Sequence, residues 1–220
     1  MKEIKESCYK GTRILIGNEK RDIINKMIPI LQIEGFVEIQ IPIIQFEEMF
    51  SDKVGEENNN MMYTFKDRGE RDLCLAPEYT AVIQKLSKTT FKQDRDVMLF
   101  YVVECFRGEK PQAGRFREFT QFGVEIINPT KDYNEYLIGL CKKLLHSFSF
   151  YTKKWSYDEF ESIIEVNTDV TRGLDYYTEG KGFEVKCDLL GSSKQIVGGG
   201  EYDGGIGFAI GIDRLINLIK

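Results

Sequence analysis

Two stretches of the chain have the pattern of neighbouring β-strands. Residues 98–105 and 119–127 are rich in β-branched and aromatic side chains, and a polar turn with Pro111 and Gly114 separates them. We therefore predict a β-hairpin. Arginines and glutamates are interleaved at the turn ends of both strands, and buried charges need partners. Guanidinium groups bind phosphate and carboxylate in a forked geometry, so we expect this surface to hold an anion.

Apolar residues at helical spacing predict a helix over residues 19–34, with Asn18 as its cap and a kink at Pro29. Asp132 and Glu135 resemble a capping box at the start of a second helix. That second helix is expected over residues 133–153. Two more helices are predicted, one over 77–86 with Pro77 in its first turn and one from Asp213 onward.

Strand-like patterns account for much of the remaining chain. They lie at 36–42, 62–65, 73–75, 163–168, 183–189 and 195–197, and residues 205–211 precede the last helix. Hairpins followed by helices, without βαβ alternation, predict an α+β fold on an antiparallel sheet. The 220 residues are 42% hydrophobic and show no repeat or linker, so we predict a single domain over residues 1–220.

Composition narrows the classes of function. A net charge of −5 argues against a broad nucleic-acid footprint, although it allows a local basic patch. Five cysteines without a Cys-x-x-Cys pair are typical of reduced thiols, which predicts a cytoplasmic protein, and we find neither a membrane-spanning run nor a signal peptide. His146 is the only histidine, which excludes a zinc site built from several imidazoles. It is expected on the solvated face of its helix.

Beyond the charged hairpin, three clusters are candidates for chemistry, and each has a simpler explanation. Residues 171–177 contain an arginine, a glycine and two tyrosines, which could supply a cation and two hydroxyl donors to a ligand. The simpler explanation is a turn followed by core aromatics. The glycines of 198–205 allow a backbone to approach a ligand, or form a flexible turn. Glu78 and Thr80 could address a ligand, or satisfy the first amides of a helix. The hairpin itself could be a surface with ion pairs.

Taken in order, these clusters resemble the catalytic domain of class II aminoacyl-tRNA synthetases, specifically the histidyl-tRNA synthetase family. The charged hairpin resembles the second class motif and Gly211-Ile212-Asp213-Arg214 the third. Arg172-Gly173-Leu174-Asp175-Tyr176-Tyr177 is the most histidine-specific element. Further matches are Gly11-Thr12-Arg13, the first class motif at Gly35 to Pro42, and Met62 to Arg68. The resemblance implies a mixed, mostly antiparallel sheet flanked by helices.

The resemblance also implies a site for ATP. Arg107 would hold the α-phosphate, Arg115 the outer phosphates and Arg172 a further position at the α-phosphate, with Mg²⁺ bridging the others. Glu109 would lie near the adenine amino group. Phe119 and Arg214 would cover the two faces of the base. Arg107, Arg172 and Arg214 are the expected catalytic residues, and no residue of the chain is expected to ligate a metal by itself.

A pocket for the amino acid is implied next to the ATP site. Glu78, Thr80, Gln121 and Glu125 would line it, with Glu78 receiving the substrate ammonium. Glu125 and the hydroxyls of Tyr177 and Tyr202 would address the imidazole of histidine, whose two nitrogens need complementary partners. The substrate carboxylate would attack the α-phosphorus and release pyrophosphate, a reaction catalysed by positioning and charge neutralisation.

Several positions depart from the family pattern. Ala76 and Glu201 stand where the family has arginines, and the charge reversal at Glu201 is expected beside the pocket. The connection from Asp203 to Gly207 is short, and most of the helical insertion before Arg172 is missing. The chain ends at Lys220, so the resemblance implies a domain without the anticodon-binding part.

The resulting expectation is an ATP-dependent ligase that activates histidine and transfers it to tRNA, acting as a homodimer through the first class motif. Two alternatives remain open. One is a non-catalytic, histidine-sensing paralogue that resembles the regulatory subunit of ATP phosphoribosyltransferase. The other is an adenylating ligase whose acceptor is not tRNA.

Overall fold

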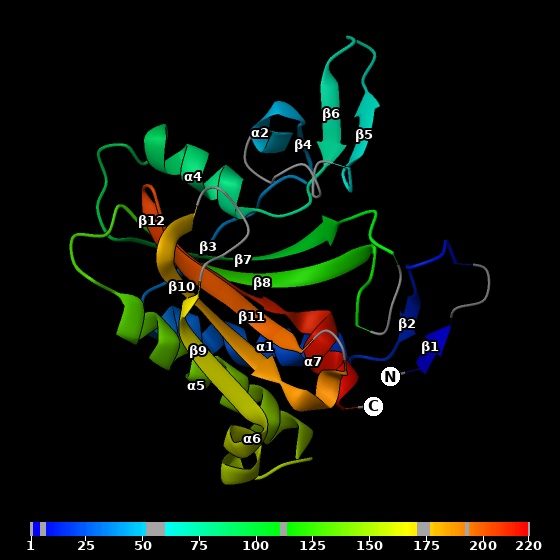
Figure 1. Ribbon diagram of the computed structural model, residues 1–220, viewed down its shortest axis with the longest axis vertical. Helices are drawn as coiled ribbons and strands as arrows, with labels where there is room; N and C mark the ends of the chain where they lie inside the picture. The colour runs from blue at the N-terminus through cyan, green and yellow to red at the C-terminus, as the bar shows by residue number, and fades with distance from the viewer. Residues whose placement is uncertain are drawn as a thin grey trace.

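A central seven-stranded sheet organises the computed structural model, which describes residues 2–4, 8–51, 60–110, 114–170, 177–191 and 194–219 (Figure 1). The strand order is β3-β7-β8-β12-β11-β10-β9. All neighbours are antiparallel except β3 and β7, so the sheet is mixed and mostly antiparallel, as predicted. The strands are β3 (Val37–Glu38), β7 (Val97–Phe106), β8 (Glu118–Ile127), β9 (Ile164–Val170), β10 (Tyr177–Cys187), β11 (Gln195–Tyr202) and β12 (Gly205–Gly211).

Helices cover one face of this sheet. They are α1 (Glu19–Ile33), α5 (Asn134–Thr152) and α7 (Ile212–Leu218), with α6 (Tyr157–Ile163) packed on α5. Phe122, Val124 and Ile126 of β8 are buried in the same cluster as the apolar stripes of α1 and α5. The alternate residues of β8 therefore face the other side, as the period of two requires.

The opposite face carries a second hydrophobic cluster, which contains Tyr79, Tyr101, Cys105 and Tyr202. It is covered in part by α4 (Thr80–Lys88), by the short helix α2 (Glu48–Ser51), and by a three-stranded sheet of β4 (Ile44–Phe46), β6 (Asp72–Leu75) and β5 (Tyr63–Lys66). A separate hairpin pairs β1 (Lys2–Ile4) with β2 (Ile14–Ile16), and η1 (Asp188–Leu190) is a single 3₁₀ turn. None of the helices in these described ranges is long and apolar enough to cross a membrane.

The predicted long hairpin is confirmed as β7 and β8, but several other boundaries were wrong. The strand expected over 183–189 begins at Tyr177 and ends at Cys187, and the strand expected over 195–197 continues to Tyr202. The strand expected over 36–42 is only β3, because the chain turns away after the Ile39 amide bonds the Phe100 carbonyl at 2.9 Å. The helix expected from Pro77 begins at Thr80 instead. Pro77 precedes the helix, and the carboxylate of Glu78 binds its first free amides.

The expected helix caps were also partly wrong. Asn18 occupies the cap position of α1 but makes no side-chain capping bond. Asp132 accepts the Asn134 amide at 2.8 Å, which closes a local turn rather than a capping box. The capping box that forms links Ser156 and Glu159 at the start of α6. Ser and Glu three residues apart before an apolar Phe160 were the available sequence signal.

His146 is packed rather than solvated. Its Nε2 lies 2.9 Å from Glu161 Oε2, and its ring centre lies 3.8 Å from that of Tyr157. The amphipathic pattern placed it on the polar face of α5, but α6 covers that face. His146 therefore joins two helices and does not line the pocket described next.

Candidate functional site

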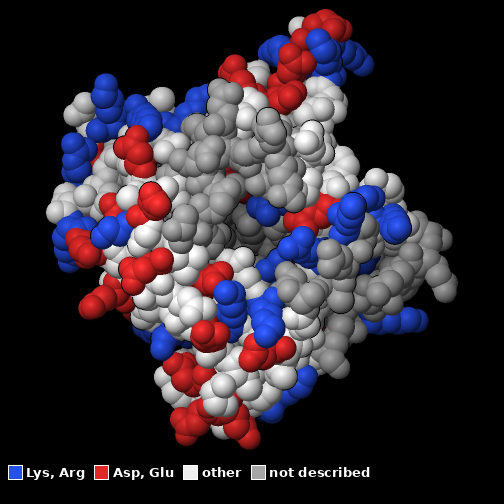
Figure 2. Space-filling view, in the orientation of Figure 1, with Lys and Arg blue, Asp and Glu red and all other residues white. Residues whose placement is uncertain are grey.

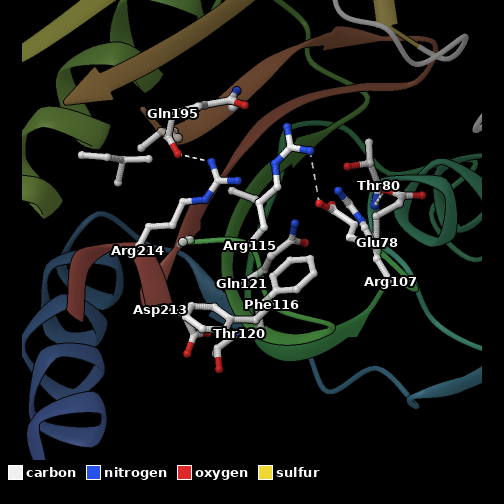
Figure 3. Close-up of a pocket in the computed structure, with 18 of the residues that line it drawn as sticks. Glu78, Thr80, Arg107, Arg115, Phe116, Thr120, Gln121, Gln195, Asp213 and Arg214 are labelled. Carbon is white, nitrogen blue, oxygen red and sulfur yellow. Dashed lines mark hydrogen bonds and ion pairs between the residues drawn. The ribbon is translucent and has the colours of Figure 1, made fainter. Parts of the chain in front are cut away.

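A pocket opens on the face of the sheet opposite α1 and α5, between the turn ends of β7 and β8, strand β11 and the start of α7 (Figure 3). The space-filling view is hollowed near its centre, and basic side chains border part of the hollow (Figure 2). Predicted site residues that line the pocket are Glu78, Thr80, Arg107, Glu109, Arg115, Phe119, Gln121, Tyr177 and Arg214. The fold thus brings together segments that are far apart in the chain.

Three arginines enter this pocket, Arg107 and Arg115 from the chain between β7 and β8, and Arg214 from α7. Arg107 donates from Nε to the Pro77 carbonyl at 2.8 Å, and its guanidinium carbon lies 5.3 Å from the ring centre of Phe119. Arg115 lies across the pocket, 3.5 Å from a carboxylate oxygen of Glu109. Arg214 donates to the Gln195 carbonyl, and the other end of its guanidinium extends into the pocket (Figure 3).

The electrostatics of these arginines favour an anionic ligand. Burial lowers the pKa of Arg214, and the positive charges of Arg107 and Arg115 lower it further, whereas Glu109 opposes them. Three carboxylates also line the pocket, but Asp213 is paired with Arg13 and Glu78 accepts backbone amides of α4, so Glu109 is the carboxylate that faces the guanidinium groups. Glu109 Oε2 is itself buried without a hydrogen-bond partner. A ligand with both phosphate oxygens and an amino group would complement the two kinds of charge.

Glu78 caps helix α4, which was one of the two roles that the sequence allowed for it. Its carboxylate oxygens accept the amides of Thr80 at 2.6 Å and Ala81 at 3.1 Å, at the start of α4. Both Glu78 and Thr80 are buried, and both line the pocket. The cap holds the carboxylate in place beside the cavity, so the structural role and a ligand-binding role are compatible.

Glu125 lies deeper, below the pocket, on the same face of β8 as Gln121. It is buried and accepts hydrogen bonds from the hydroxyls of Tyr101 at 3.0 Å and Tyr202 at 2.9 Å. Burial raises the pKa of Glu125 to about 8, although the two tyrosine hydroxyls act in the opposite direction. The ring of Tyr177 lies 6.3 Å from that of Tyr202, which connects this group to the pocket.

Tyr101 was not predicted as a site residue. It stands directly across from Gly123 in the β7–β8 ladder, and a Cβ on Gly123 would lie 2.1 Å from the Tyr101 ring. The ring therefore crosses the neighbouring strand to reach Glu125. The glycine between Gln121 and Glu125 was the sequence signal for this crossing, because a strand glycine marks a close approach.

The glycine-rich segment is strand β11 and its turn, not a flexible loop. Its glycines permit close packing within the sheet. A Cβ on Gly199 would meet the Gly207 carbonyl at 2.6 Å, and a Cβ on Gly207 would overlap Glu125 Oε2 at 1.8 Å. The absence of these side chains leaves room for the buried carboxylate.

Other predicted positions lie elsewhere. Arg172 falls outside the described residues. Glu201 does not line the pocket, so its expected place beside it was wrong: it lines a separate cavity with residues 129–134. The reason is strand alternation, since its neighbour Tyr202 faces Glu125. Ala76 is fully buried in the second cluster, and its carbonyl accepts the Phe106 amide at 3.0 Å.

The described residues hold no group of three or more His, Cys, Asp or Glu side chains arranged to bind a metal. In the pocket, the Glu78 carboxylate is engaged in helix capping, while Glu109 faces Arg115. Such a set does not form a metal site by itself. We assign no residue to Mg²⁺.

The sequence model of the family described as histidyl-tRNA synthetase matches residues 18–137. The histidine–tRNA ligase of Clostridioides difficile is 26% identical over 311 aligned positions, which cover 96% of this chain and 74% of the relative. That of Methanococcus vannielii is 38% identical over 130 residues, or 57% of this chain and 31% of the relative. The first alignment is longer than the whole chain of 220 residues, so the relative has segments without a counterpart here.

Solved structures show the same fold. Apo histidyl-tRNA synthetase of Staphylococcus aureus superposes with a TM-score of 0.70 and 25% identity, covering 96% of this chain and 69% of that one. A protein described as an ATP phosphoribosyltransferase regulatory subunit/histidyl-tRNA synthetase from Bacillus halodurans C has a TM-score of 0.72 at 16% identity, covering 100% and 84%. The second likeness concerns the fold alone. Fold and sequence together place the chain in the histidyl-tRNA synthetase family, with the catalytic fold of class II synthetases.

Proposed function

We propose that this protein activates histidine with ATP to form histidyl-adenylate and transfers the histidyl group to tRNA. The observation that carries the proposal is the convergence of Arg107, Arg115 and Arg214 in one pocket, which Phe119 and Tyr177 also line. The ring of Tyr177 lies 6.3 Å from that of Tyr202, whose hydroxyl donates to the buried Glu125. Cations, an aromatic surface and a buried carboxylate correspond to the phosphates, the base and the imidazole of the two substrates.

ATP would lie over the turn ends of β7 and β8. Phe119 offers its ring to one face of the adenine, and Arg214 covers the other. Glu109 Oε2 faces Arg115 at 3.5 Å without forming a hydrogen bond, and it would accept the adenine amino group. Arg107 would hold the α-phosphate, assisted by Arg172, and Arg115, which is half-exposed, reaches outward to the β- and γ-phosphates. Mg²⁺ would be held by the phosphates themselves.

Histidine would occupy the part of the cavity lined by Tyr177, with Glu125 buried behind it. Glu78 and Thr80 line the pocket and would receive its ammonium, and Gln121, which lines the same pocket, would lie toward the ATP phosphates. The imidazole would meet Glu125, Tyr177 and Tyr202. With its raised pKa, Glu125 can donate a proton to a ring nitrogen or accept one from the ring N–H. The substrate carboxylate is already ionised at neutral pH, so the chain needs only to align it with the α-phosphorus and to stabilise the departing pyrophosphate.

We also propose that the protein is a homodimer. Exposed apolar side chains gather around a groove lined by residues within 39–46, by Val82 and Leu86 of α4, and by Asp67, Arg71 and Leu73. Val37, Ile43, Ile44 and Phe46 belong to this region and are exposed in the single chain. Contiguous exposed apolar surface of this kind marks protein interfaces.

The test is pyrophosphate exchange measured with each of the twenty amino acids. We expect exchange that depends on histidine, and a loss of about 10²- to 10³-fold in kcat for Arg107→Ala, because one positioned donor to developing charge has that effect. Arg95→Ala, which removes an exposed arginine remote from the pocket, should leave the rate unchanged. Folded protein that binds ATP but shows no exchange with any amino acid would refute the proposal.

Two further measurements separate the alternatives. Calorimetry should detect ATP binding, whereas a histidine sensor would bind histidine without ATP. An aminoacylation assay with histidine tRNA should show transfer. Adenylate formation without transfer would instead favour an acceptor other than tRNA.

A further inference from the structure

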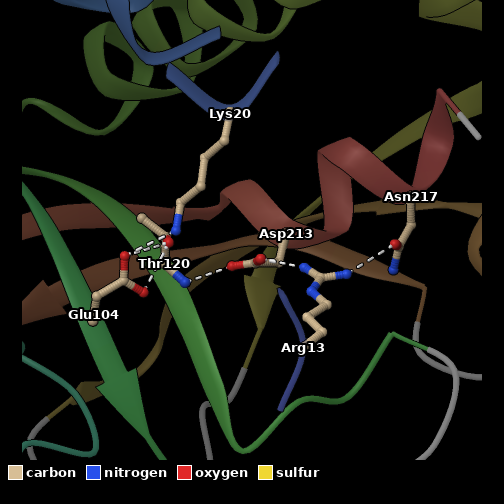
Figure 4. Close-up of polar contacts among 6 residues, drawn as sticks. All are labelled: Arg13, Lys20, Glu104, Thr120, Asp213 and Asn217. Atoms are coloured by element: carbon tan, nitrogen blue, oxygen red, sulfur yellow. Dashed lines mark hydrogen bonds and ion pairs between the residues drawn. The ribbon is translucent and has the colours of Figure 1, made fainter. Parts of the chain in front are cut away.

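Arg13 lies outside the pocket yet contacts two of the segments that form it, helix α7 and the loop before β8. Its side chain is only 4% exposed. The guanidinium pairs with the Asp213 carboxylate, lies 3.5 Å from Asn217 Oδ1, and stacks 3.6 Å from the ring centre of Phe116 (Figure 4). A planar cation that forms bonds in its plane and stacks on a ring uses the features that separate arginine from lysine.

Asp213 is the carboxylate through which Arg13 reaches the site. One of its oxygens binds Arg13, and the other accepts the backbone amide of Thr120 at 2.5 Å. Thr120 lies between Phe119 and Gln121, and Asp213 directly precedes Arg214. One buried carboxylate therefore fixes β8 and α7 relative to each other at the point where both contribute pocket residues. Removing its cation would leave a buried charge unpaired, which strongly disfavours this arrangement.

The segment before Arg13 supports the pocket loop as well. The Arg117 amide donates to the Gly11 carbonyl at 2.8 Å, and Arg117 Nη1 donates to the Lys10 carbonyl at 3.0 Å. Phe116, stacked on Arg13, lines the pocket beside Arg115. Residues 10–13 thus hold the loop from which the outermost of the three arginines projects.

Thr120 is also fixed through its side chain. Its hydroxyl lies 2.9 Å from both Glu104 carboxylate oxygens, and Lys20 pairs with the same carboxylate at 2.9 Å. This second contact reaches Thr120 from α1 and does not involve Arg13. Loss of Arg13 should therefore disturb the link between β8 and α7 while the strand itself remains in the sheet.

We propose that Arg13 is a positioning residue for ATP: acting through Asp213 and Phe116, it sets the relative placement of Arg214, Phe119 and Arg115. The inference rests on the proposed adenylation. Arg13 touches no substrate in this scheme. Its effect falls on the ATP half of the site, because Glu125, Tyr101 and Tyr202 are connected by their own hydrogen bonds and do not depend on Asp213.

The experiment compares Arg13→Ala and Arg13→Lys with wild type in histidine-dependent pyrophosphate exchange, varying ATP and histidine separately. For Arg13→Ala we expect kcat/KM for ATP to fall by about 100-fold, because small misplacements have effects of that size. The KM for histidine should stay within about threefold on the same argument. Arg13→Lys keeps a positive charge beside Asp213 but loses the stacking on Phe116. Its kcat/KM for ATP should be about tenfold higher than that of Arg13→Ala.

Lys143→Met is the matched control, because it breaks a 2.7 Å ion pair with Glu34 between α5 and α1, away from the pocket. It should leave both substrates unaffected. Thermal unfolding of every variant is measured alongside. If Arg13→Ala does not fold, Arg13→Lys carries the comparison.

ATP affinity from calorimetry supplies a readout without turnover. Unchanged ATP affinity and kinetics in folded Arg13 variants overturn the inference, as does a parallel loss for ATP and histidine. A wild type that binds ATP without exchange refutes the proposed function, while weaker ATP binding by Arg13→Ala would still support the positioning role. A wild-type protein that neither binds ATP nor catalyses exchange refutes both the proposed function and the positioning role of Arg13.

Discussion

Glu125 is the residue whose ionisation should be visible in the stability of the whole protein. It is buried between Tyr101 and Tyr202, and burial raises its pKa from an ordinary 4.5 to about 8. The folded protein therefore holds this proton more tightly than the unfolded chain does. The resulting stabilisation is complete below about pH 4.5 and is lost as the pH rises through about 8.

We predict that Glu125→Gln removes this pH dependence. Relative to the variant, wild type should lose stability between pH 4.5 and 8, by an amount on the order of a few kcal/mol. Urea unfolding at a series of pH values measures the difference. If the free energy of unfolding depends on pH in the same way for both proteins through this window, Glu125 is ionised in the folded state at neutral pH.

At the same scale, the sequence identified many site residues but not their partners. The resemblance named Glu125 and Tyr202, and the period of two placed Gln121 and Glu125 on one face, as the structure confirms. Tyr101 was not identified from the sequence, because its hydrogen bond to Glu125 joins β7 to β8 across Gly123. Such a contact depends on strand register, which no single stretch of sequence contains.

Among the elements, α4 connects local helix chemistry to the pocket. Glu78→Ala should destabilise the protein by about 1 kcal/mol through the lost cap, and should also weaken histidine binding. Ser156→Ala removes the capping box of α6, away from the pocket, and should cost a similar free energy of unfolding without changing the KM for histidine. Unfolding and exchange measured on both variants separate the two roles. An equal KM for both would assign Glu78 to capping alone.

The glycine-rich segment shows why element types were harder to predict near the site. The glycines of 198–205 predict a segment that approaches a ligand or a flexible turn, because glycine disfavours strands in general. Instead, β11 pairs with β10 and β12, and its glycines allow the sheet to pack around Glu125 and Phe208. A local preference was overridden by the space that tertiary neighbours require.

For the whole molecule, we predict a dimer in solution at micromolar concentration. Ile44→Asp places a charge on an exposed strand beside the apolar groove and should shift the mass toward that of a monomer, because burying an unpaired charge at an interface is costly. Phe150→Asp changes an equally apolar but more exposed side chain on α5, and should leave the dimer intact. Sedimentation equilibrium gives both masses. A monomeric wild type contradicts the prediction.

The amino-acid sequence by itself determined the long hairpin, the antiparallel α+β class and the family, because alternation, helical spacing and motif order are local properties. Only the tertiary structure determined which charged side chains contact one another. It turned Glu201 away from the pocket, packed His146 against α6, and joined Arg13 to Asp213 across 200 positions of the chain. The physical reason is that a side chain's partner depends on strand parity, register and the packing of distant segments, and these are settled only when the sheet assembles.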